Sequence, residues 1–285
     1  MTTLYEGAFA KLNLTLDVLG KRDDGYHDLQ SVMQTISVRD DIEIDVGTGK
    51  PWKLLCSVEG IPTDERNLAW KAAKVYCDTM KKDPDGLEIR ITKRIPSGAG
   101  MGGGSADAAA VLRALNRHYG SPLSIMALAE LGAEVGSDVP FCVLCGTAMA
   151  EGRGERLRKL PDMPDCIFVV CKPEFSVSTP VLYRQLDAVE TPIHPNNDAM
   201  EVAIRAADLQ GIASHIENAF DPVVSADHPE ISHIKGIYLS HGALAAQMTG
   251  SGSVVFGILP DMTAAEHAAE ELKQHYGDVH IVFPV

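Results

Sequence analysis

The chain has 285 residues, of which 45% are hydrophobic and 22% are charged, and its formal net charge is −14. This composition is typical of an ordered globular protein with a substantial core and room for about two domains. The acidic balance argues against a nucleic-acid partner, because phosphate backbones require a basic protein face, although a local basic site for a small anion remains compatible with it.

The amino-terminal residues lack the charged and apolar regions of a signal peptide, and no apolar run approaches the ~20 residues that span a bilayer. Among six cysteines, Cys142 and Cys145 form a C-x-x-C pattern inside an apolar run, without a second pair. This context favours buried thiols in a strand over zinc or redox chemistry. We therefore expect a protein of the reducing cytoplasm, without a membrane partner.

The first predicted element is a strand at residues 8–18. In it a polar set alternates with an apolar set: Lys11, Asn13, Thr15 and Asp17 against Leu12, Leu14, Leu16 and Val18. This period of two places Lys11 and Asn13 on the same face, about 7 Å apart by strand rise. Taken alone, the alternation is most often that of a strand with one solvated face.

Hydrophobic periodicity and turn residues predict most of the remaining elements. In chain order we expect strands near 29–38 and 41–46, a helix at 67–80, a strand at 87–91, a helix at 124–135, a hairpin-like segment at 148–155, a strand at 166–171 and a helix at 264–276. A proline-containing segment at 161–164 predicts a boundary between domains at 1–160 and 161–285.

The most informative segment follows the predicted strand at 87–91. Five of the nine residues from Gly98 to Ala106 are glycine, and a helical pattern begins immediately afterwards. Backbone N–H groups that no Cβ shields, together with the positive end of a helix dipole, form a binding site for phosphate. The segment therefore predicts a nucleotide-binding loop.

Two other interpretations of this loop are less favoured. A flexible surface turn does not need so many glycines directly before an amphipathic helix. A dinucleotide-binding fold is consistent with G-x-G-x-x-G at Gly98, Gly100 and Gly103, but the acidic residue expected about 20 positions later is missing. A Walker loop is excluded, because no Gly-Lys-Ser or Gly-Lys-Thr occurs in the chain.

One acidic residue stands in a distinctive context, the segment Gly136-Ser-Asp138-Val-Pro140. It lies between a predicted helix and an apolar segment expected to be a strand. On these grounds alone Asp138 is either a turn or helix-capping residue or a functional carboxylate. A second glycine turn, Met248-Thr-Gly-Ser-Gly252, leads into a further strand.

Four separated segments together resemble the GHMP small-molecule kinases: Ala10-Lys-Leu-Asn-Leu, the loop from Pro96 to Ser105, Gly136-Ser-Asp-Val-Pro and Met248-Thr-Gly-Ser-Gly. Three more are similar to the members of this family whose acceptor is a cytidylylated methylerythritol of isoprenoid precursor biosynthesis. They are Arg22-Asp-Asp-Gly-Tyr-His27, the Glu151–Glu155 segment and Ser178-Thr-Pro-Val-Leu-Tyr183. The resemblance extends from residue 8 to about residue 257.

The chain departs from the family pattern at two places. Ala106 replaces the second serine that usually ends the glycine loop, which removes one hydroxyl that could contact phosphate or metal. The family's Asn-Asp-hydrophobe-Glu segment has its nearest counterpart in Glu217-Asn-Ala-Phe-Asp221, and we carry no role onto these residues.

The resemblance implies an α+β fold, with an amino-terminal GHMP domain at 1–160 and a ferredoxin-like carboxy-terminal domain at 161–285. It implies ATP-dependent phosphorylation of the hydroxyl at C2 of a methylerythritol unit joined to cytidine diphosphate. Mg²⁺ would bridge the β- and γ-phosphates. By the same resemblance Asp138 is the base that receives the hydroxyl proton, and Lys11 keeps that base ionised. The resemblance does not identify the protein ligands of the metal.

The resemblance also assigns binding residues. The ATP phosphates would lie in a loop made of Pro96, Ser97, Gly98, Ala99, Gly100, Met101, Gly102, Gly103, Gly104, Ser105 and Ala106. Asn67 and Lys93 would lie nearer the adenosine. The acceptor would be bound by Asn13, Tyr26, His27 and Tyr183, because aromatic rings stack on a pyrimidine and an imidazole can hydrogen-bond its edge.

Two alternatives stay open at this point. Another GHMP kinase could act on a mevalonate-type acid, homoserine or a sugar, although such acceptors do not need the Gly-Tyr-His segment. A non-catalytic nucleotide-binding regulator would be favoured if Lys11 or Asp138 were missing, and both are present.

Overall fold

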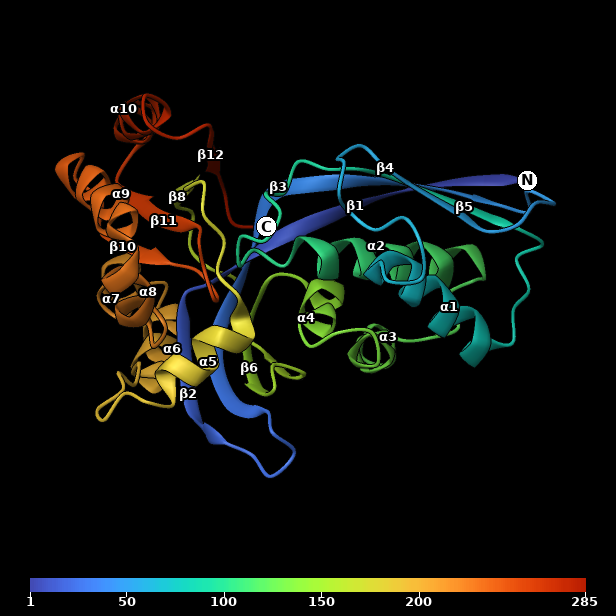
Figure 1. Ribbon diagram of the computed structural model, residues 1–285, viewed down its shortest axis with the longest axis horizontal. Helices are drawn as coiled ribbons and strands as arrows, with labels where there is room; N and C mark the ends of the chain where they lie inside the picture. The colour runs from blue at the N-terminus through green and yellow to red at the C-terminus, as the bar shows by residue number, and fades with distance from the viewer. The chain divides into compact units, whose positions relative to one another are not determined.

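The computed structural model describes residues 1–285. The chain divides into two compact units that interleave along the sequence: residues 1–10, 38–95 and 102–145 form the first unit, and residues 11–37, 96–101 and 146–285 form the second. Figure 1 labels the helices and strands of both units. The domain boundary near residue 160 stays a prediction.

The first unit contains part of a sheet in which β1 (Thr2–Asn13) pairs with the long strand β3 (His27–Val46). Strand β5 (Leu87–Thr92) is antiparallel to the second half of β3, and β4 (Lys53–Cys56) is parallel to β5. The two strands predicted at 29–38 and 41–46 are thus one continuous strand, because the intervening polar residues do not interrupt its extended backbone.

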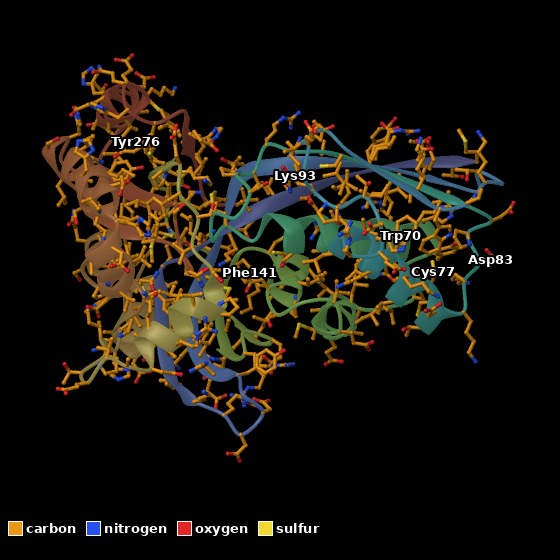
Figure 2. All side chains as sticks on the ribbon, in the orientation of Figure 1. Trp70, Cys77, Asp83, Lys93, Phe141 and Tyr276 are labelled. Carbon is orange, nitrogen blue, oxygen red and sulfur yellow. The ribbon has the colours of Figure 1, made fainter.

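Four helices complete the first unit: α1 (Leu68–Met80), α2 (Gly103–His118), α3 (Ile125–Ala133) and α4 (Val139–Leu144). Helix α2 contacts the other three, and its buried face is rich in alanine, which allows close approach. Figure 2 shows Trp70 and Cys77 on α1 and Phe141 on α4. The helices predicted at 67–80 and 124–135 are confirmed.

The strand predicted for the C-x-x-C segment is wrong. Cys142 lies buried in α4, and Cys145 directly follows this helix at φ +57°. Pro140 stands in the first turn, where a missing N–H costs no helical hydrogen bond. A short apolar run fits a buried strand and a buried helical turn equally well, so its pattern alone could not decide.

In the second unit, the first half of β3 pairs with β2 (Thr15–Lys21) and with β6 (Thr147–Gly152). Strand β6 forms a hairpin with β7 (Arg156–Lys159), which confirms the predicted hairpin-like segment. The two-residue strand β9 (Glu217–Asn218) runs parallel to β2.

The second unit also contains a four-stranded antiparallel sheet made of β8 (Ile167–Lys172), β10 (Ala245–Met248), β11 (Val255–Leu259) and β12 (Asp278–Val282). Its strand order is β10-β11-β8-β12. Numbered along the chain this order is 2-3-1-4, the arrangement of a ferredoxin-like sheet. The predicted ferredoxin-like topology and the α+β class are therefore confirmed.

Two helices, α9 (Pro229–Ser240) and α10 (Met262–Lys273), pack against this sheet. Their buried side chains, such as Ile234, Tyr238 and Leu272, share one core with strand residues such as Val169 and Val255. The remaining helices of this unit are α5 (Thr179–Leu186), α6 (Asn197–Arg205), α7 (Leu209–Ser214) and α8 (Asp221–Asp227).

The polar face of the first predicted strand is not solvated. Lys11, Asn13, Thr15 and Asp17 are each at most 4% exposed. Thr15 donates to Asn197 at the start of α6 over 2.5 Å, and Asp17 contacts His194 over 2.8 Å. This face lies against polar groups from distant parts of the chain, which periodicity cannot reveal.

None of the helices combines the length and the apolar character that a bilayer-spanning helix requires.

Candidate active site

Three segments that are distant in sequence meet at the end of β1 within the second unit. The backbone N–H of Lys11 donates to the carbonyl of Met101 in the glycine loop over 3.1 Å. The N–H of Asn13 donates to Thr249 Oγ1 over 2.8 Å, and the N–H of Val254 donates to the carbonyl of Ala99 over 3.3 Å. The strand, the glycine loop and the second glycine turn therefore form one connected structure.

Buried side chains of β1 and β3 form a chain of hydrogen bonds that ends at the backbone of β2. The Lys11 ammonium donates to Asn13 Oδ1, and Asn13 Nδ2 donates to Ser31 Oγ over 2.7 Å. Ser31 Oγ donates in turn to the carbonyl of Thr15 over 2.5 Å. Because a buried ammonium requires polar partners, Asn13 orients Lys11 in addition to any contact with a ligand.

The glycine loop approaches the second glycine turn closely. Gly100 has φ +74°, and a Cβ on it would lie 2.3 Å from the carbonyl oxygen of Thr249. Gly250 has φ +58°, and a Cβ on it would lie 2.8 Å from the carbonyl oxygen of Gly100. Each glycine is thus required by the backbone of the other segment.

Asn218 is a site residue to which sequence reasoning gave no role. Its Nδ2 donates to the carbonyls of Met248 and Gly250 over 2.8 and 2.9 Å, and its Oδ1 accepts from the N–H of Phe220 over 2.9 Å. It is 1% exposed. Asn218 therefore holds the second glycine turn. Its place in the Glu217–Asp221 counterpart of a family motif was the available signal.

The remainder of the glycine segment belongs to the first unit and begins helix α2. Gly102 precedes the helix at φ +70° and provides no side-chain cap, and the first turn has no acidic residue. The first N–H groups of a helix have no partner within it. Ala106 is 1% exposed, while Ser105 is partly exposed. This end of α2 is thus chemically suited to an anion, and Ser105 provides a hydroxyl there.

Asp138 lies at the residue that directly precedes α4, which is the N-cap position. Its side chain nevertheless makes no capping hydrogen bond. The capping interpretation requires such a hydrogen bond, so the structure does not support it. Lys11 belongs to the second unit and Asp138 to the first.

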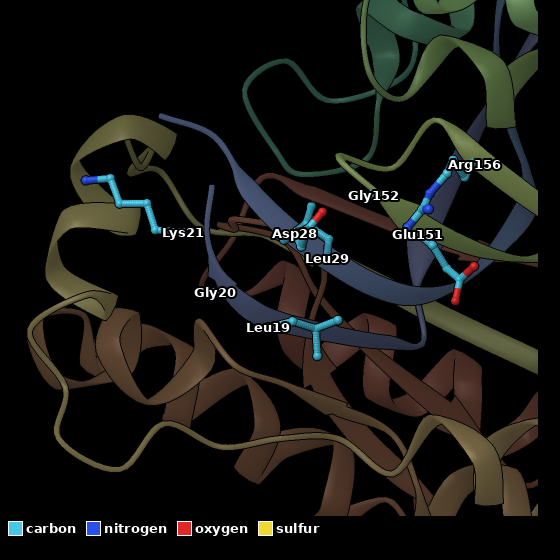
Figure 3. Close-up of a pocket in the computed structure, with 8 residues that line it drawn as sticks. All are labelled: Leu19, Gly20, Lys21, Asp28, Leu29, Glu151, Gly152 and Arg156. Atoms are coloured by element: carbon cyan, nitrogen blue, oxygen red, sulfur yellow. The ribbon is translucent and has the colours of Figure 1, made fainter. Parts of the chain in front are cut away.

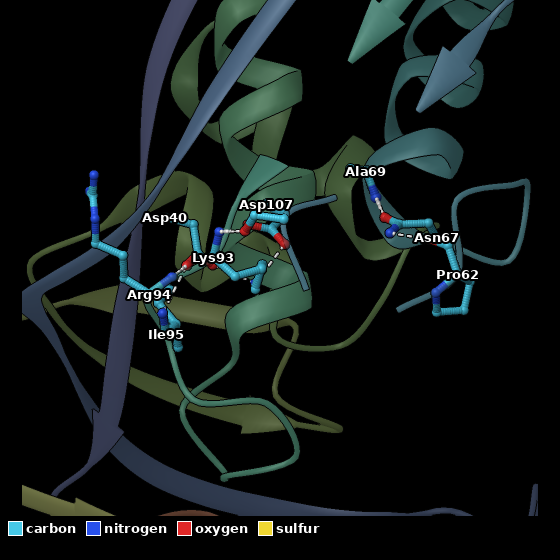
Figure 4. A network of polar contacts seen from close by, with 9 residues as sticks. Asp40, Pro62, Asn67, Ala69, Lys93, Arg94, Ile95 and Asp107 are labelled. Carbon is cyan, nitrogen blue, oxygen red and sulfur yellow. Dashed lines mark hydrogen bonds and ion pairs between the residues drawn. The ribbon is translucent and has the colours of Figure 1, made fainter. Parts of the chain in front are cut away.

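The two residues expected near the adenosine have structural partners within the first unit (Figure 4). Asn67 caps helix α1: its Oδ1 accepts from the N–H of Ala69 over 2.9 Å, and its Nδ2 donates to the carbonyl of Pro62 over 2.8 Å. The Lys93 side chain is 5% exposed, and its ammonium pairs with Asp40 and Asp107.

The residues expected to bind cytidine lie together in the second unit. The rings of His27 and Tyr183 stack with centroids 4.4 Å apart and an angle of 16°, and His27 Nε2 lies 2.7 Å from Asp187 Oδ1. Tyr26 is 56% exposed and has the Arg153 guanidinium 5.1 Å above its ring. Sequence reasoning missed Asp187, because no motif around this residue indicates a binding role.

A cavity of about 410 Å³ lies beside the hairpin that β2 and β3 form (Figure 3). It is lined by Leu19, Gly20, Lys21, Asp28, Leu29, Glu151, Gly152 and Arg156. Lys21 also approaches Asp187, with its Nζ 3.8 Å from Oδ2. Cationic and acidic side chains of β2, β3, β6 and β7 therefore line a cavity next to His27, which stacks on Tyr183 of α5.

Comparison with known proteins places these features in a family. Residues 67–146 match the GHMP kinases N terminal domain, and residues 200–278 match the GHMP kinases C terminal domain. Two relatives named 4-diphosphocytidyl-2-C-methyl-D-erythritol kinase, from Lachnoclostridium phytofermentans and Caldicellulosiruptor saccharolyticus, are each 45% identical over 266 residues. Each alignment covers 93% of this chain and 91% of the relative.

Solved structures agree with this placement. A crystal structure of 4-(cytidine 5'-diphospho)-2C-methyl-D-erythritol kinase superposes with a TM-score of 0.82 at 31% identity, covering 98% of each chain. A homoserine kinase from Cytophaga hutchinsonii has a TM-score of 0.81 at 19% identity, covering 99% of this chain and 94% of its own, and shares the fold. The chain therefore belongs to the GHMP kinases, in the family of 4-diphosphocytidyl-2-C-methyl-D-erythritol kinases.

Proposed function

We propose that this protein transfers the γ-phosphoryl group of ATP to the C2 hydroxyl of 4-diphosphocytidyl-2-C-methyl-D-erythritol. The observation that carries the proposal is the connected structure of the β1 end, the glycine loop and the second glycine turn around Lys11 and Asn13. Relatives at 45% identity that bear the kinase name support it.

In this proposal the nucleotide phosphates contact the glycine segment 96–106. Pro96, Ala99, Met101 and Ala106 are buried, so these residues contribute through their backbone, whereas Ser97 and Gly98 are exposed. Backbone N–H groups and the α2 dipole stabilise the negative charge that spreads over the transferring group.

Asp138 receives the proton of the attacking hydroxyl. A tertiary alcohol is a weak nucleophile, so a positioned carboxylate near it assists the attack. The Gly136-Ser-Asp138-Val-Pro140 context, which resembles the family pattern, supports this role. The Lys11 ammonium, oriented by Asn13, stabilises negative charge on the transferring phosphoryl group.

Mg²⁺ is expected to accompany ATP. No three His, Cys, Asp or Glu side chains are grouped so that they could hold a metal by themselves. A magnesium ion bound through phosphate oxygens and water needs only one or two protein ligands, and the partly exposed Ser105 hydroxyl fits that requirement. When bound, the ion would neutralise charge on the β- and γ-phosphates.

The cytosine end of the acceptor is bound at Tyr26, His27 and Tyr183. Stacking of His27 on Tyr183 and the contact of His27 with Asp187 support this assignment, because they hold a flat aromatic surface beside a polar ring edge. Cys56, Cys77, Cys166 and Cys171 form no disulfide, which supports a reducing compartment such as the cytoplasm.

The test is the release of ADP with a set of acceptors. We expect rapid turnover with the cytidylylated substrate and little with methylerythritol phosphate, mevalonate or homoserine. Equal use of the cytidylylated and plain acceptors would contradict the cytidine assignment. Preference for mevalonate or homoserine would reassign the chain to another acceptor class of GHMP kinase.

The role of Asp138 is tested by Asp138→Asn, which keeps the side-chain shape but cannot accept the proton. Turnover should fall by about 10²- to 10⁴-fold, the usual contribution of a general base. Binding of a non-hydrolysable ATP analogue, measured by calorimetry, should stay nearly unchanged.

The matched control is Asp208→Asn. Asp208 also occupies an N-cap position, that of helix α7, and its side chain makes no capping hydrogen bond. Asp208→Asn should leave turnover unchanged. If Asp138→Asn retained more than about half of the wild-type turnover, Asp138 would not be the base.

A further inference from the structure

The most unusual polar cluster of the first unit is buried beside the start of α2. It consists of Asp40, Lys93 and Asp107, which we call the Lys93 clamp (Figure 4). The Lys93 ammonium pairs with Asp40 and lies 2.8 Å from Asp107 Oδ2. The three side chains are 5% exposed or less. One ammonium therefore faces two carboxyl groups in a nearly water-free setting.

The clamp contacts the chain on both sides of the glycine loop. Before the loop, Asp40 Oδ1 accepts from the N–H groups of Arg94 and Ile95 over 2.5 and 2.8 Å. After the loop, Asp107 lies in the second turn of α2, and a Cβ on Gly103 would lie only 3.4 Å from Lys93 Nζ. Lys93 thus joins the end of β5 to the beginning of α2.

Stability alone does not explain this arrangement. Removing two carboxyl groups and an ammonium from water is costly, and well-packed apolar residues often replace such groups without loss of stability. One oxygen, Asp107 Oδ1, is buried without any hydrogen-bond partner. Burial and the nearby Asp40 raise the pKa of the Asp107 carboxyl to about 8, although Lys93 acts in the opposite direction.

We propose that the Lys93 clamp positions the glycine loop for the triphosphate, so that Lys93 is a positioning residue and not a ligand of the adenosine. Glycine-rich segments lose much conformational entropy when they are ordered. A loop whose two ends are already joined loses less upon binding, which strengthens the affinity for phosphate. The proposal depends on the proposed function only in that this loop binds a nucleotide.

The proposal is tested with Lys93→Met, which keeps the length of the side chain and removes its charge. The KM for ATP should rise about 10- to 100-fold, within the range that misplacement of a binding group produces, while the KM for the acceptor changes little. Calorimetry without acceptor should show that inorganic tripolyphosphate binding weakens by a similar factor, because the clamp acts on the phosphate loop.

A ligand of the adenosine would behave differently. In that case Lys93→Met would weaken ATP and leave tripolyphosphate binding unchanged, which would overturn the proposal. Because both binding measurements omit the acceptor, they test the clamp even if the acceptor is misassigned. Failure of the wild-type protein to bind either ATP or tripolyphosphate would contradict the nucleotide-binding assignment of the loop, and the clamp proposal with it.

Two variants of Asp107 keep the test decisive if Lys93→Met does not fold. Asp107→Asn retains an acceptor for the Lys93 ammonium and should bind tripolyphosphate like the wild type. Asp107→Leu fills a similar volume but breaks the connection to α2, so it should reproduce the phosphate defect. The control Lys74→Met removes an exposed partner of Asp78 on α1 and should change neither affinity. Wild-type tripolyphosphate binding by Asp107→Leu would overturn the proposal.

Discussion

At the scale of single residues, Gly100 and Gly250 show that a glycine can be required by the protein's own backbone as well as by a ligand. Each approaches the other segment so closely that a Cβ would lie 2.3 or 2.8 Å from a carbonyl oxygen. Backbone atoms cannot move aside as a flexible side chain can. The glycine loop and the second glycine turn therefore depend on each other for their conformations.

We expect Gly100→Ala to destabilise the protein and to weaken ATP binding, because it combines a positive φ with a clash against the Thr249 carbonyl. The control Gly120→Ala has a similar φ of +85° but meets no atom within 4 Å, so it carries only the conformational cost of about 1–2 kcal/mol. Denaturant unfolding and calorimetry measure the two effects. Equal losses for both variants would show that the close approach contributes nothing.

At the scale of elements, helix α5 and Asp187, the residue that directly follows it, present two side chains to His27 of β3. Tyr183 and Asp187 are four residues apart, at the spacing that places side chains on one helix face, and both contact His27. Tyr183 also packs edge-on against Phe220, with centroids 5.0 Å apart. The short helix thus holds the His27 ring in both position and orientation.

Tyr183→Ala should raise the KM for the cytidylylated acceptor by about 5- to 150-fold, since loss of a base–aromatic contact is worth roughly 1–3 kcal/mol. The KM for ATP should change far less. Tyr183→Phe retains the ring and should behave like the wild type. Steady-state kinetics with each substrate varied in turn checks this expectation. An equal rise in both KM values would place Tyr183 outside the cytidine site.

At the scale of the whole molecule, stability is linked to pH through buried carboxyls. The folded state raises the pKa of Asp107 from 3.8 to about 8, mainly through burial. The charged groups that act on this carboxyl are Lys93 and Asp40. Between these two pH values the folded protein holds a proton that the unfolded chain releases, so this group makes stability fall as pH rises.

Asp107→Asn removes the carboxyl that titrates. The free energy of unfolding of this variant, relative to that of the wild type, should therefore rise as the pH increases from 5 to 8. The difference should grow by up to about 1.4 kcal/mol per pH unit and level off above the folded pKa. Urea unfolding of both proteins across this range provides the measurement. Asp78→Asn, at an exposed ion pair, should show no such trend. A constant difference between Asp107→Asn and the wild type would exclude a raised pKa.

The sequence by itself determined the family and the α+β class, and it predicted that the glycine segment binds a nucleotide. These depend on local patterns, namely closely spaced glycines before a helix and short motifs such as Gly-Tyr-His and Gly-Ser-Asp-Val-Pro. Only the tertiary structure decided that Cys142 lies in a helix and that the polar face of β1 and β2 is buried. Likewise, Lys93 pairs with carboxylates 53 and 14 residues away. Contacts between segments without a periodic relation form only when the chain folds, so no local pattern records them.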